Sequence, residues 1–220
     1  MKLTYLGHSA FEIFTKDQKI LIDPFLVKSP NYDINDVTNI FVTHAHSDHL
    51  GSAIEISRKN KAKITAIFEL ANYCSSKGAI TTGINLGGKI SYLWGKVSAV
   101  PAFHSSSTPE GFYGGCPCGF IFEIENHVIY HAGDTCLNQE MKTVCELYKP
   151  DISILPVGGY FTMDIDEAVK ASEWLGSNTI IPMHYNTFDL ISVNINSFKE
   201  KLEKIGKTPL ILDIGAPVEL

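Results

Sequence analysis

Apolar and polar positions alternate in short blocks near the N-terminus, and this spacing predicts strands over residues 2–6, 10–14 and 19–23. An apolar, β-rich run predicts a buried strand over residues 39–43. Further along, strand-like runs alternate with segments whose apolar residues recur at helical spacing. The other predicted strands are 63–67, 90–94, 97–103, 119–125, 128–130, 151–156, 179–183 and 209–213, and the predicted helices are 51–60, 69–77, 138–148, 164–175 and 194–205. Strand-rich blocks flanked by helices favour an α/β fold with two sheets packed face to face and helices outside.

The order of elements in the first half recurs in the second half. Each half contains a strand meander and then a strand–helix–strand series. Residues 128–134 of the second half loosely resemble residues 20–23 of the first half. No Pro/Gly/Ser-rich or charged linker separates the halves. We therefore expect a single domain over residues 1–220 with an internal pseudo-repeat.

The amino-acid composition indicates which partners and which cellular location to expect. The 220 residues carry a formal net charge of −6 with a pI near 5.7 and no visible basic stripe, which disfavours nucleic acid as a partner. No secretory signal and no run long enough to span a bilayer is visible, so no membrane association is expected. We expect a cytoplasmic protein that acts on a small molecule. A homo-oligomer is left open.

The five cysteines follow no disulfide-scaffold pattern, which favours a reducing compartment. Cys116 and Cys118 flank one proline and resemble a metal clip. Without a second cysteine pair, two packed residues in a loop are the simpler interpretation, and the sequence leaves their role open.

Metal-binding residue types gather just after the strand predicted at 39–43. In an extended backbone His44, His46 and Asp48 share one side, and a turn into the next helix would return His49 toward them. Neutral imidazoles with a carboxylate favour a divalent metal, with zinc as the default. A solvated polar loop is the plain alternative.

Three further donors follow apolar, strand-like runs, namely His104, Asp134 and His184. Sites of α/β proteins lie at the carboxyl ends of strands. A single histidine in such a place is usually a core residue, but three such donors beside a metal motif favour a shared site.

These residues and motifs resemble the metallo-β-lactamase superfamily, whose fold is a four-layer αββα sandwich and whose ligands run His-x-His-x-Asp-His, then His, Asp and His. Within it, the chain looks most like the bacterial and archaeal metal-dependent hydrolase family related to L-ascorbate-6-phosphate lactonase. The matching segments are residues 5–11, 21–25, 43–51, 131–135 and 158–163.

The resemblance implies a dinuclear metal centre with Zn or Mn. One ion would be held by His44, His46 and His104, a second by Asp48, His49 and His184, and both by a bridging Asp134. His46 also separates the chain from the similar di-iron branch, which typically has Glu at that position. Two cations about 3.5–4 Å apart lower the pKa of a shared water toward 7 and so provide hydroxide for attack on a carbonyl carbon or phosphorus. As the catalytic residue, Asp48 would orient the hydroxide or pass a proton to the leaving group.

Three residues are candidates for supporting roles. His8 would reach the substrate or relay a proton, although a surface turn is as good an interpretation. Asp23 would orient a ligand imidazole through its second nitrogen, or simply end a strand. Thr135 would support Asp134, or cap the next helix.

The predicted function is hydrolysis of a small ester-like substrate, either a lactone or a phosphodiester. An RNA-processing nuclease is one alternative, although 220 residues leave no room for a separate RNA-gripping domain. A non-catalytic, metal-stabilised scaffold is another, against which the open coordination positions of this ligand set argue.

Overall fold

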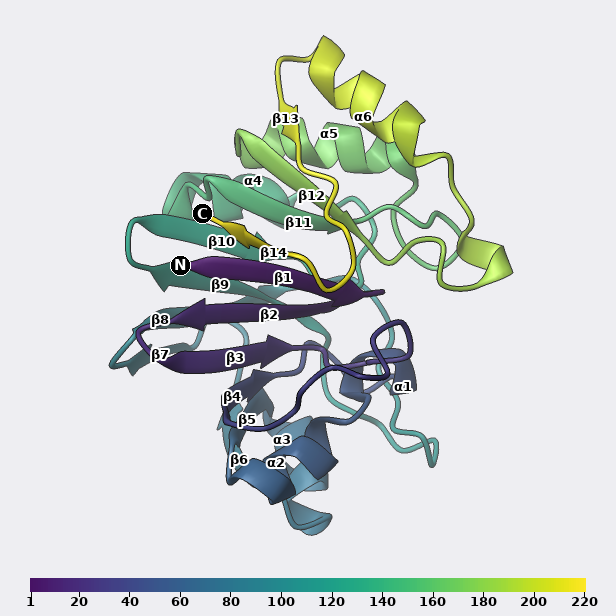
Figure 1. The fold of residues 1–220 in the computed structure, drawn as a ribbon. Coiled ribbons are helices and arrows are strands. Elements are labelled where there is room, and N and C mark those ends of the chain that lie inside the picture. Colours follow the sequence, from purple (N-terminus) through teal and green to yellow (C-terminus); the bar gives the residue numbers. More distant parts are fainter. The chain divides into compact units, whose positions relative to one another are not determined.

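The computed structural model describes residues 1–220, and its internal contacts divide the chain into two compact units. Unit 1 comprises Met1–Gly88, Ser105–Pro117 and Leu212–Leu220, and unit 2 comprises Lys89–His104 and Cys118–Ile211. Each unit contains one seven-stranded sheet with its own helices (Figure 1).

The sheet of unit 1 is mixed, with strand order β14-β1-β2-β3-β4-β5-β6. β1, β2 and β3 form an antiparallel meander, and β3 to β6 run parallel. The strands are β1 (Lys2–Gly7), β2 (Ala10–Thr15), β3 (Gln18–Ile22), β4 (Val37–Phe41), β5 (Lys63–Ile67), β6 (Ile80–Ile84) and β14 (Pro217–Glu219), and the helices are α1 (Ser47–Leu50), α2 (Ala53–Asn60) and α3 (Phe68–Ser76).

The core of unit 1 lies between β4, β5 and the helices α2 and α3. Ile40 and Ile64 of the two strands are fully buried, as are Ile56 of α2 and Leu70 of α3. Burial of each such side chain contributes about 1.5–3 kcal/mol. Successive residues of both strands are buried, as expected of parallel strands that are covered on both faces. The packed core fixes the place where β4 ends, which is where the histidine motif begins.

The sheet of unit 2 has the order β13-β12-β11-β10-β9-β8-β7. β7 to β10 are antiparallel and β10 to β13 are parallel. Helix α5 contacts β11 and lies beside α4 and α6. The elements are β7 (Lys89–Tyr92), β8 (Gly95–Pro101), β9 (Cys118–Ile124), β10 (His127–His131), β11 (Ile152–Pro156), β12 (Thr179–Met183), β13 (Thr208–Pro209), α4 (Glu140–Tyr148), α5 (Ile165–Leu175), α6 (Ile195–Lys204) and a 3₁₀ turn (Asp189–Ile191).

Several predicted boundaries are wrong for identifiable reasons. β6 was missed because its Thr-Thr-Gly centre is only partly buried and only its last residue, Ile84, is part of the core. The strand predicted at 209–213 is reduced to two residues, whereas residues 217–219 pair with β1 although they are too short to show a pattern. β4 ends at Phe41, two residues before the predicted end.

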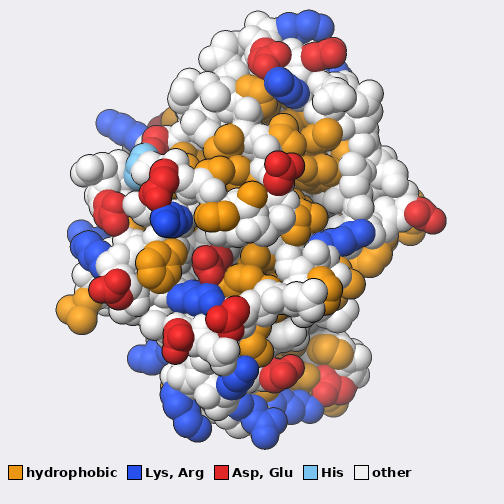
Figure 2. Space-filling view, in the orientation of Figure 1, with side chains coloured by type: hydrophobic (Ala, Val, Ile, Leu, Met, Phe, Trp, Pro, Cys, Tyr) orange, Lys and Arg blue, Asp and Glu red, His pale blue; other side chains and the backbone are white.

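The predicted α/β class is confirmed, since each unit combines a mixed sheet with helices. The helices all fall short of the length and hydropathy that a bilayer crossing requires. On the face that Figure 2 shows, acidic and basic side chains are interspersed with apolar ones, so neither sign of charge dominates that face.

Candidate metal centre

His44 and His46 lie in an irregular segment after β4, not in the strand itself. α1 begins at Ser47 with His46 as its N-cap, so a turn, and not strand alternation, brings the two imidazoles together. His44 Nε2 lies 2.9 Å from His46 Nδ1. Zn–N bonds are about 2.0–2.1 Å long, so two nitrogens this far apart can share one ion.

Asp23 fixes the orientation of His49. Its Oδ2 lies 2.8 Å from His49 Nδ1, and neither side chain has any solvent exposure. With Nδ1–H donating to the carboxylate, His49 carries its lone pair on Nε2, the nitrogen it can offer to a metal.

Thr43 links Asp23 to a second histidine, His44, through hydrogen bonds. The backbone N–H of Thr43 donates to Asp23 Oδ1 at 2.8 Å, and its hydroxyl donates to Asp23 Oδ2 at 2.7 Å. Because that hydroxyl has given its hydrogen to the carboxylate, its oxygen accepts from His44 Nδ1, which is 3.1 Å away. His44 therefore presents Nε2. The sequence analysis missed Thr43, whose only signal was its place between the strand and the first histidine.

Asp48 is paired with His8. His8 Nε2 lies 3.1 Å from Asp48 Oδ2, and Asp48 keeps 28% side-chain exposure. His8 is buried, not a surface turn residue, and it has a left-handed backbone with φ of 57°. Tyr5 holds this turn by donating its hydroxyl to the carbonyl of His8 at 3.0 Å.

Residues of the segment 105–117 form hydrogen-bond contacts with the histidine motif. Ser106 is buried and its hydroxyl oxygen accepts from the backbone N–H of Ala45 at 3.2 Å. Ser105 Oγ lies 3.5 Å from His46 Nε2. Ser106 was also missed, because its partner is 61 residues away along the chain.

Gly51 ends α1 against the segment that follows Asp23. Its φ is 43°, and a Cβ at this position would lie 2.4 Å from the carbonyl oxygen of Pro24. Ser52 also donates its N–H to that oxygen at 3.0 Å. Only glycine allows this approach, which holds Asp48 and His49 next to Asp23.

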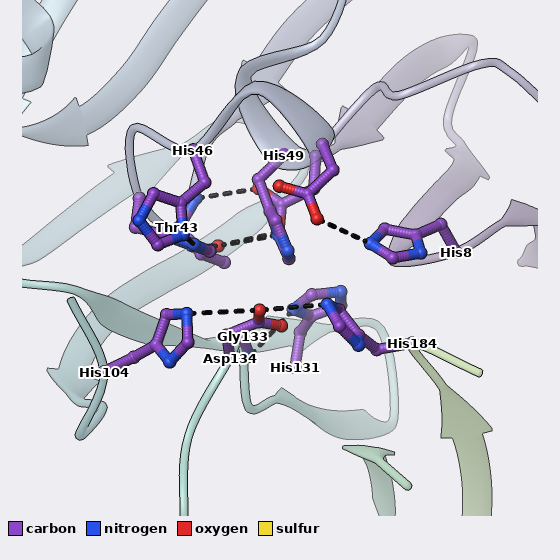
Figure 3. Close-up of polar contacts among 12 residues, drawn as sticks. His8, Thr43, His46, His49, His104, His131, Gly133, Asp134 and His184 are labelled. Atoms are coloured by element: carbon purple, nitrogen blue, oxygen red, sulfur yellow. Dashed lines mark hydrogen bonds and ion pairs between the residues drawn. The ribbon is translucent and has the colours of Figure 1, made fainter. Parts of the chain in front are cut away.

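Unit 2 contributes a second set of donors. Asp134 Oδ2 lies 3.1 Å from His184 Nε2 and 3.5 Å from His104 Nε2 (Figure 3). His104 follows β8, Asp134 follows β10 and His184 follows β12, so three strands of one sheet supply them. Asp134 and His184 are each 2% exposed. One oxygen of Asp134 therefore lies within ion-pair distance of two imidazoles.

Thr135 ties the segments of His104 and Asp134 together. Its hydroxyl oxygen accepts from the N–H of Phe103 and from Asn138 Nδ2, both at 3.0 Å, and donates to the carbonyl of Cys136 at 2.9 Å. The N-cap of α4 is Gln139, so Thr135 does not cap that helix.

The loop after β11 lies flush against the backbone of His184. A Cβ on Gly158 would come within 2.3 Å of the carbonyl oxygen of His184. His184 itself has a φ of 55°, an uncommon conformation for a residue with a side chain. The tight contact and the unusual backbone together fix the direction of the His184 ring.

The remaining histidines are structural. His131 is fully buried and its Nδ1 accepts from the N–H of Gly133 at 3.3 Å. The hairpin position of His127 predicts an exposed side chain, which is wrong: the side chain is 27% exposed and its Nδ1 is 2.7 Å from Asp151 Oδ2. Cys116 is exposed and Cys118 is buried at the start of β9, and neither forms a disulfide.

The donor set fits a divalent metal. Buried imidazoles have their tautomers set by hydrogen bonds to Asp23 and Thr43, and Asp134 adds a buried carboxylate. This is how histidine ligands are oriented in metalloproteins.

Comparisons with known proteins agree with this chemistry. Residues 2–184 match the model of the beta-lactamase superfamily domain. A UPF0173 metal-dependent hydrolase of Methanosarcina barkeri is 42% identical over 100% of this chain and 99% of its own, and one of Nanoarchaeum equitans is 42% identical over the whole of both chains. The chain therefore belongs to the UPF0173 metal-dependent hydrolase family of the beta-lactamase superfamily.

A solved structure extends the comparison. Igni18, described as a novel metallo hydrolase from Ignicoccus hospitalis, is 35% identical with a TM-score of 0.88, and the match covers 100% of this chain and 98% of that one.

Proposed function

We propose that this chain hydrolyses a small ester-like substrate, a lactone or a phosphodiester, at a centre of two divalent ions, with Zn favoured over Mn. The observation that carries the proposal is the Asp134 Oδ2 atom within 3.5 Å of Nε2 of both His104 and His184. A carboxylate so placed is suited to bridge two ions. The absence of a basic stripe and of a disulfide framework supports a cytoplasmic enzyme with a small-molecule substrate.

We assign the ligands to two ions. The first ion would be held by His44, His46 and His104. The second would be held by Asp48, His49 and His184, with Asp134 common to both. This assignment rests on family membership and on the tautomers that Asp23 and Thr43 impose.

Divalent ions bound there would supply Lewis acidity and a nucleophile at neutral pH. The side chains of the protein do the rest. Asp48, the partly exposed carboxylate, would take up a proton at a carboxylate oxygen and return it to the leaving oxygen. His8 would hold Asp48 in the required rotamer through its 3.1 Å contact. Asp23 would keep the imidazoles of His44 and His49 fixed throughout.

The test is metal content together with turnover. Protein reconstituted with Zn²⁺ or Mn²⁺ should bind two ions per chain by mass spectrometry and should hydrolyse members of a lactone and phosphodiester panel. Asp134→Ala should lose both ions, and His46→Ala should lose one ion and reduce kcat by about 100-fold or more.

His127→Ala is the matched control, because His127 is also a histidine paired with an aspartate but lies away from the ligands. It should keep both ions and full activity. Reconstituted protein that is inert on the whole panel, or His46→Ala protein that behaves like wild type, would contradict the proposal.

A further inference from the structure

A groove of about 670 Å³ opens within unit 1, between the segment that follows β3 and the helices α1 and α2. Its volume lies in the range of small-molecule sites. The segment after β3 supplies a mainly apolar wall, formed by Phe25, Leu26, Val27, Pro30, Tyr32 and Ile34.

The groove begins next to the metal-binding motif. Ser47 lines it and stands between His46 and Asp48, and successive Cα atoms are only 3.8 Å apart. Phe25, on the other wall, contacts the His8 ring edge-on with 5.6 Å between centroids, and His8 bonds Asp48. The groove therefore lies close to Asp48, which does not itself line it.

The charged residues in the groove lining indicate whether a charged or an uncharged ligand fits there. Glu55 is the one ionisable carboxylate in the lining, and neither lysine nor arginine lines it. The Tyr32 hydroxyl donates to Glu12, and burial with this bond raises the pKa of Tyr32, so the residue stays neutral. A phosphate placed here would face Glu55 without a cation to balance it, whereas an uncharged apolar group would displace water from apolar walls.

The walls are held in place by backbone contacts. The Ser29 hydroxyl donates to the carbonyl of Leu6 at 2.9 Å, and the N–H of Tyr32 donates to the carbonyl of Ser29 at 3.0 Å. Together with the approach of Gly51 to Pro24, these contacts fix the segment at several points along its length. The groove is thus formed before any ligand binds.

We propose that this groove binds the uncharged apolar chain of a carboxylic ester or lactone substrate. The proposal rests on the hydrolase function above. In the reaction, water adds its oxygen to the acyl carbon, the acyl C–O bond breaks, and the proton of the water passes to the leaving oxygen. The products are a carboxylic acid and an alcohol, which remain one molecule when the substrate is a lactone.

The test compares chain lengths on the reconstituted enzyme. The value of kcat/KM for 4-nitrophenyl octanoate should exceed that for 4-nitrophenyl acetate by about ten-fold or more, and γ-decalactone should exceed γ-butyrolactone similarly, because each buried methylene favours binding. Val27→Glu should lower the octanoate value about ten-fold and change the acetate value less than about two-fold.

The matched control is Phe68→Glu. Phe68 is 56% exposed and Val27 is 53% exposed, both lie in unit 1, and only Val27 lines the groove. Phe68→Glu should leave both ester rates unchanged. Equal loss in the two variants would overturn the groove assignment.

Two further outcomes separate this proposal from the hydrolase function itself. An active enzyme with equal kcat/KM for acetate and octanoate, or with faster hydrolysis of bis(4-nitrophenyl) phosphate, overturns the groove proposal and leaves the hydrolase intact. If the protein hydrolyses nothing, binding of 2-decanone still tests whether the groove takes up an apolar chain. Methyl NMR shifts at Leu26, Val27 and Ile34 with 2-decanone but not with octyl phosphate support the groove, and their absence overturns it.

Discussion

Asp23 orients more side chains of the site than any single proposed ligand does. Its two oxygens receive the N–H and hydroxyl of Thr43 and the Nδ1–H of His49, all inside the protein. Through Thr43 it also sets the tautomer of His44. One buried carboxylate thus orients two imidazoles that belong to different proposed metal positions.

Asp23→Asn tests this role, because it preserves size and removes the charge. The affinity for Zn²⁺, measured by competition with a chromogenic chelator, should fall about 10–100-fold. Asp151→Asn is the control, since Asp151 pairs with His127 in the same way but away from the ligands. Equal affinity in the wild type and Asp23→Asn would show that Asp23 is only a strand-end residue.

Thiol reactivity should follow burial. Burial raises the pKa of the Cys74 thiol to about 12, and Cys74 is fully buried, whereas Cys116 and Cys136 are exposed. At pH 8, alkylation followed by mass spectrometry should label the two exposed thiols first and Cys74 on the order of a thousand-fold more slowly, because the thiolate is the reactive form. Labelling of Cys74 at the rate of Cys116 would mean that the α3 side of the core opens readily.

Motif spacing and strand ends predicted that His44 lies beside His46 and that Asp134 lies beside His104 and His184, as the structure shows. Their role as metal ligands stays a prediction. Thr43 and Ser106 could not be predicted, since their roles arise from hydrogen bonds to Asp23 and Ala45, which lie 20 and 61 residues away. The partial burial of His127 was missed because its partner, Asp151, lies 24 residues further along the chain.

At the scale of elements, helix α5 has the most complete N-terminal cap of the molecule. The Asp164 side chain accepts from the N–H of Glu167 at 2.8 Å, and the Glu167 side chain accepts from the N–H of Asp164 at 3.2 Å. This reciprocal pair satisfies backbone groups that the helix itself cannot reach. It begins the helix that packs on β11.

Asp164→Ala should lower the free energy of unfolding by about 1 kcal/mol in urea denaturation. Glu173→Ala is the control on the same helix, since it removes only an exposed pair with Lys170 and should cost less than about 0.5 kcal/mol. An Asp164→Ala protein as stable as Glu173→Ala would contradict the capping argument.

Strands with strong local patterns were predicted to the residue. β5 and β12 match their predicted ranges because both are short, mainly apolar runs. β12 lies between Asn178 and His184, and β5 ends where α3 begins. β6 and β14 have no such pattern, and their strands exist because a neighbouring strand offers backbone partners. Pairing of that kind depends on the fold and leaves little trace in the sequence.

At the scale of the whole molecule, family and fold class followed from motifs spread over most of the chain, and the comparisons confirm both. A single domain over residues 1–220 stays a prediction. The contacts instead define two units, and the chain returns to the first for its last nine residues, Leu212–Leu220. No local pattern in that segment indicates the return.

Metal removal should act on the molecule as a whole. An ion that binds only the folded state at about 1,000 times its Kd adds about 4 kcal/mol, which for a chain of this size corresponds to a Tm change of roughly 10 °C. Differential scanning calorimetry with and without a chelator measures the change, and added Zn²⁺ should restore the Tm. His44→Ala protein should respond much less, and an unchanged Tm in the wild type would argue against metal at these residues.

One edge of each sheet is a very short strand that contains a proline, with Pro217 in β14 and Pro209 in β13. Proline has no N–H to offer, and two or three residues give a foreign strand little to pair with. These borders therefore discourage copies of the protein from joining sheet to sheet. Deleting β14 would expose the backbone N–H and C=O groups of β1 along this edge. Because β1 is an apolar strand with buried leucines and a tyrosine, the exposed edge would then promote aggregation at high concentration.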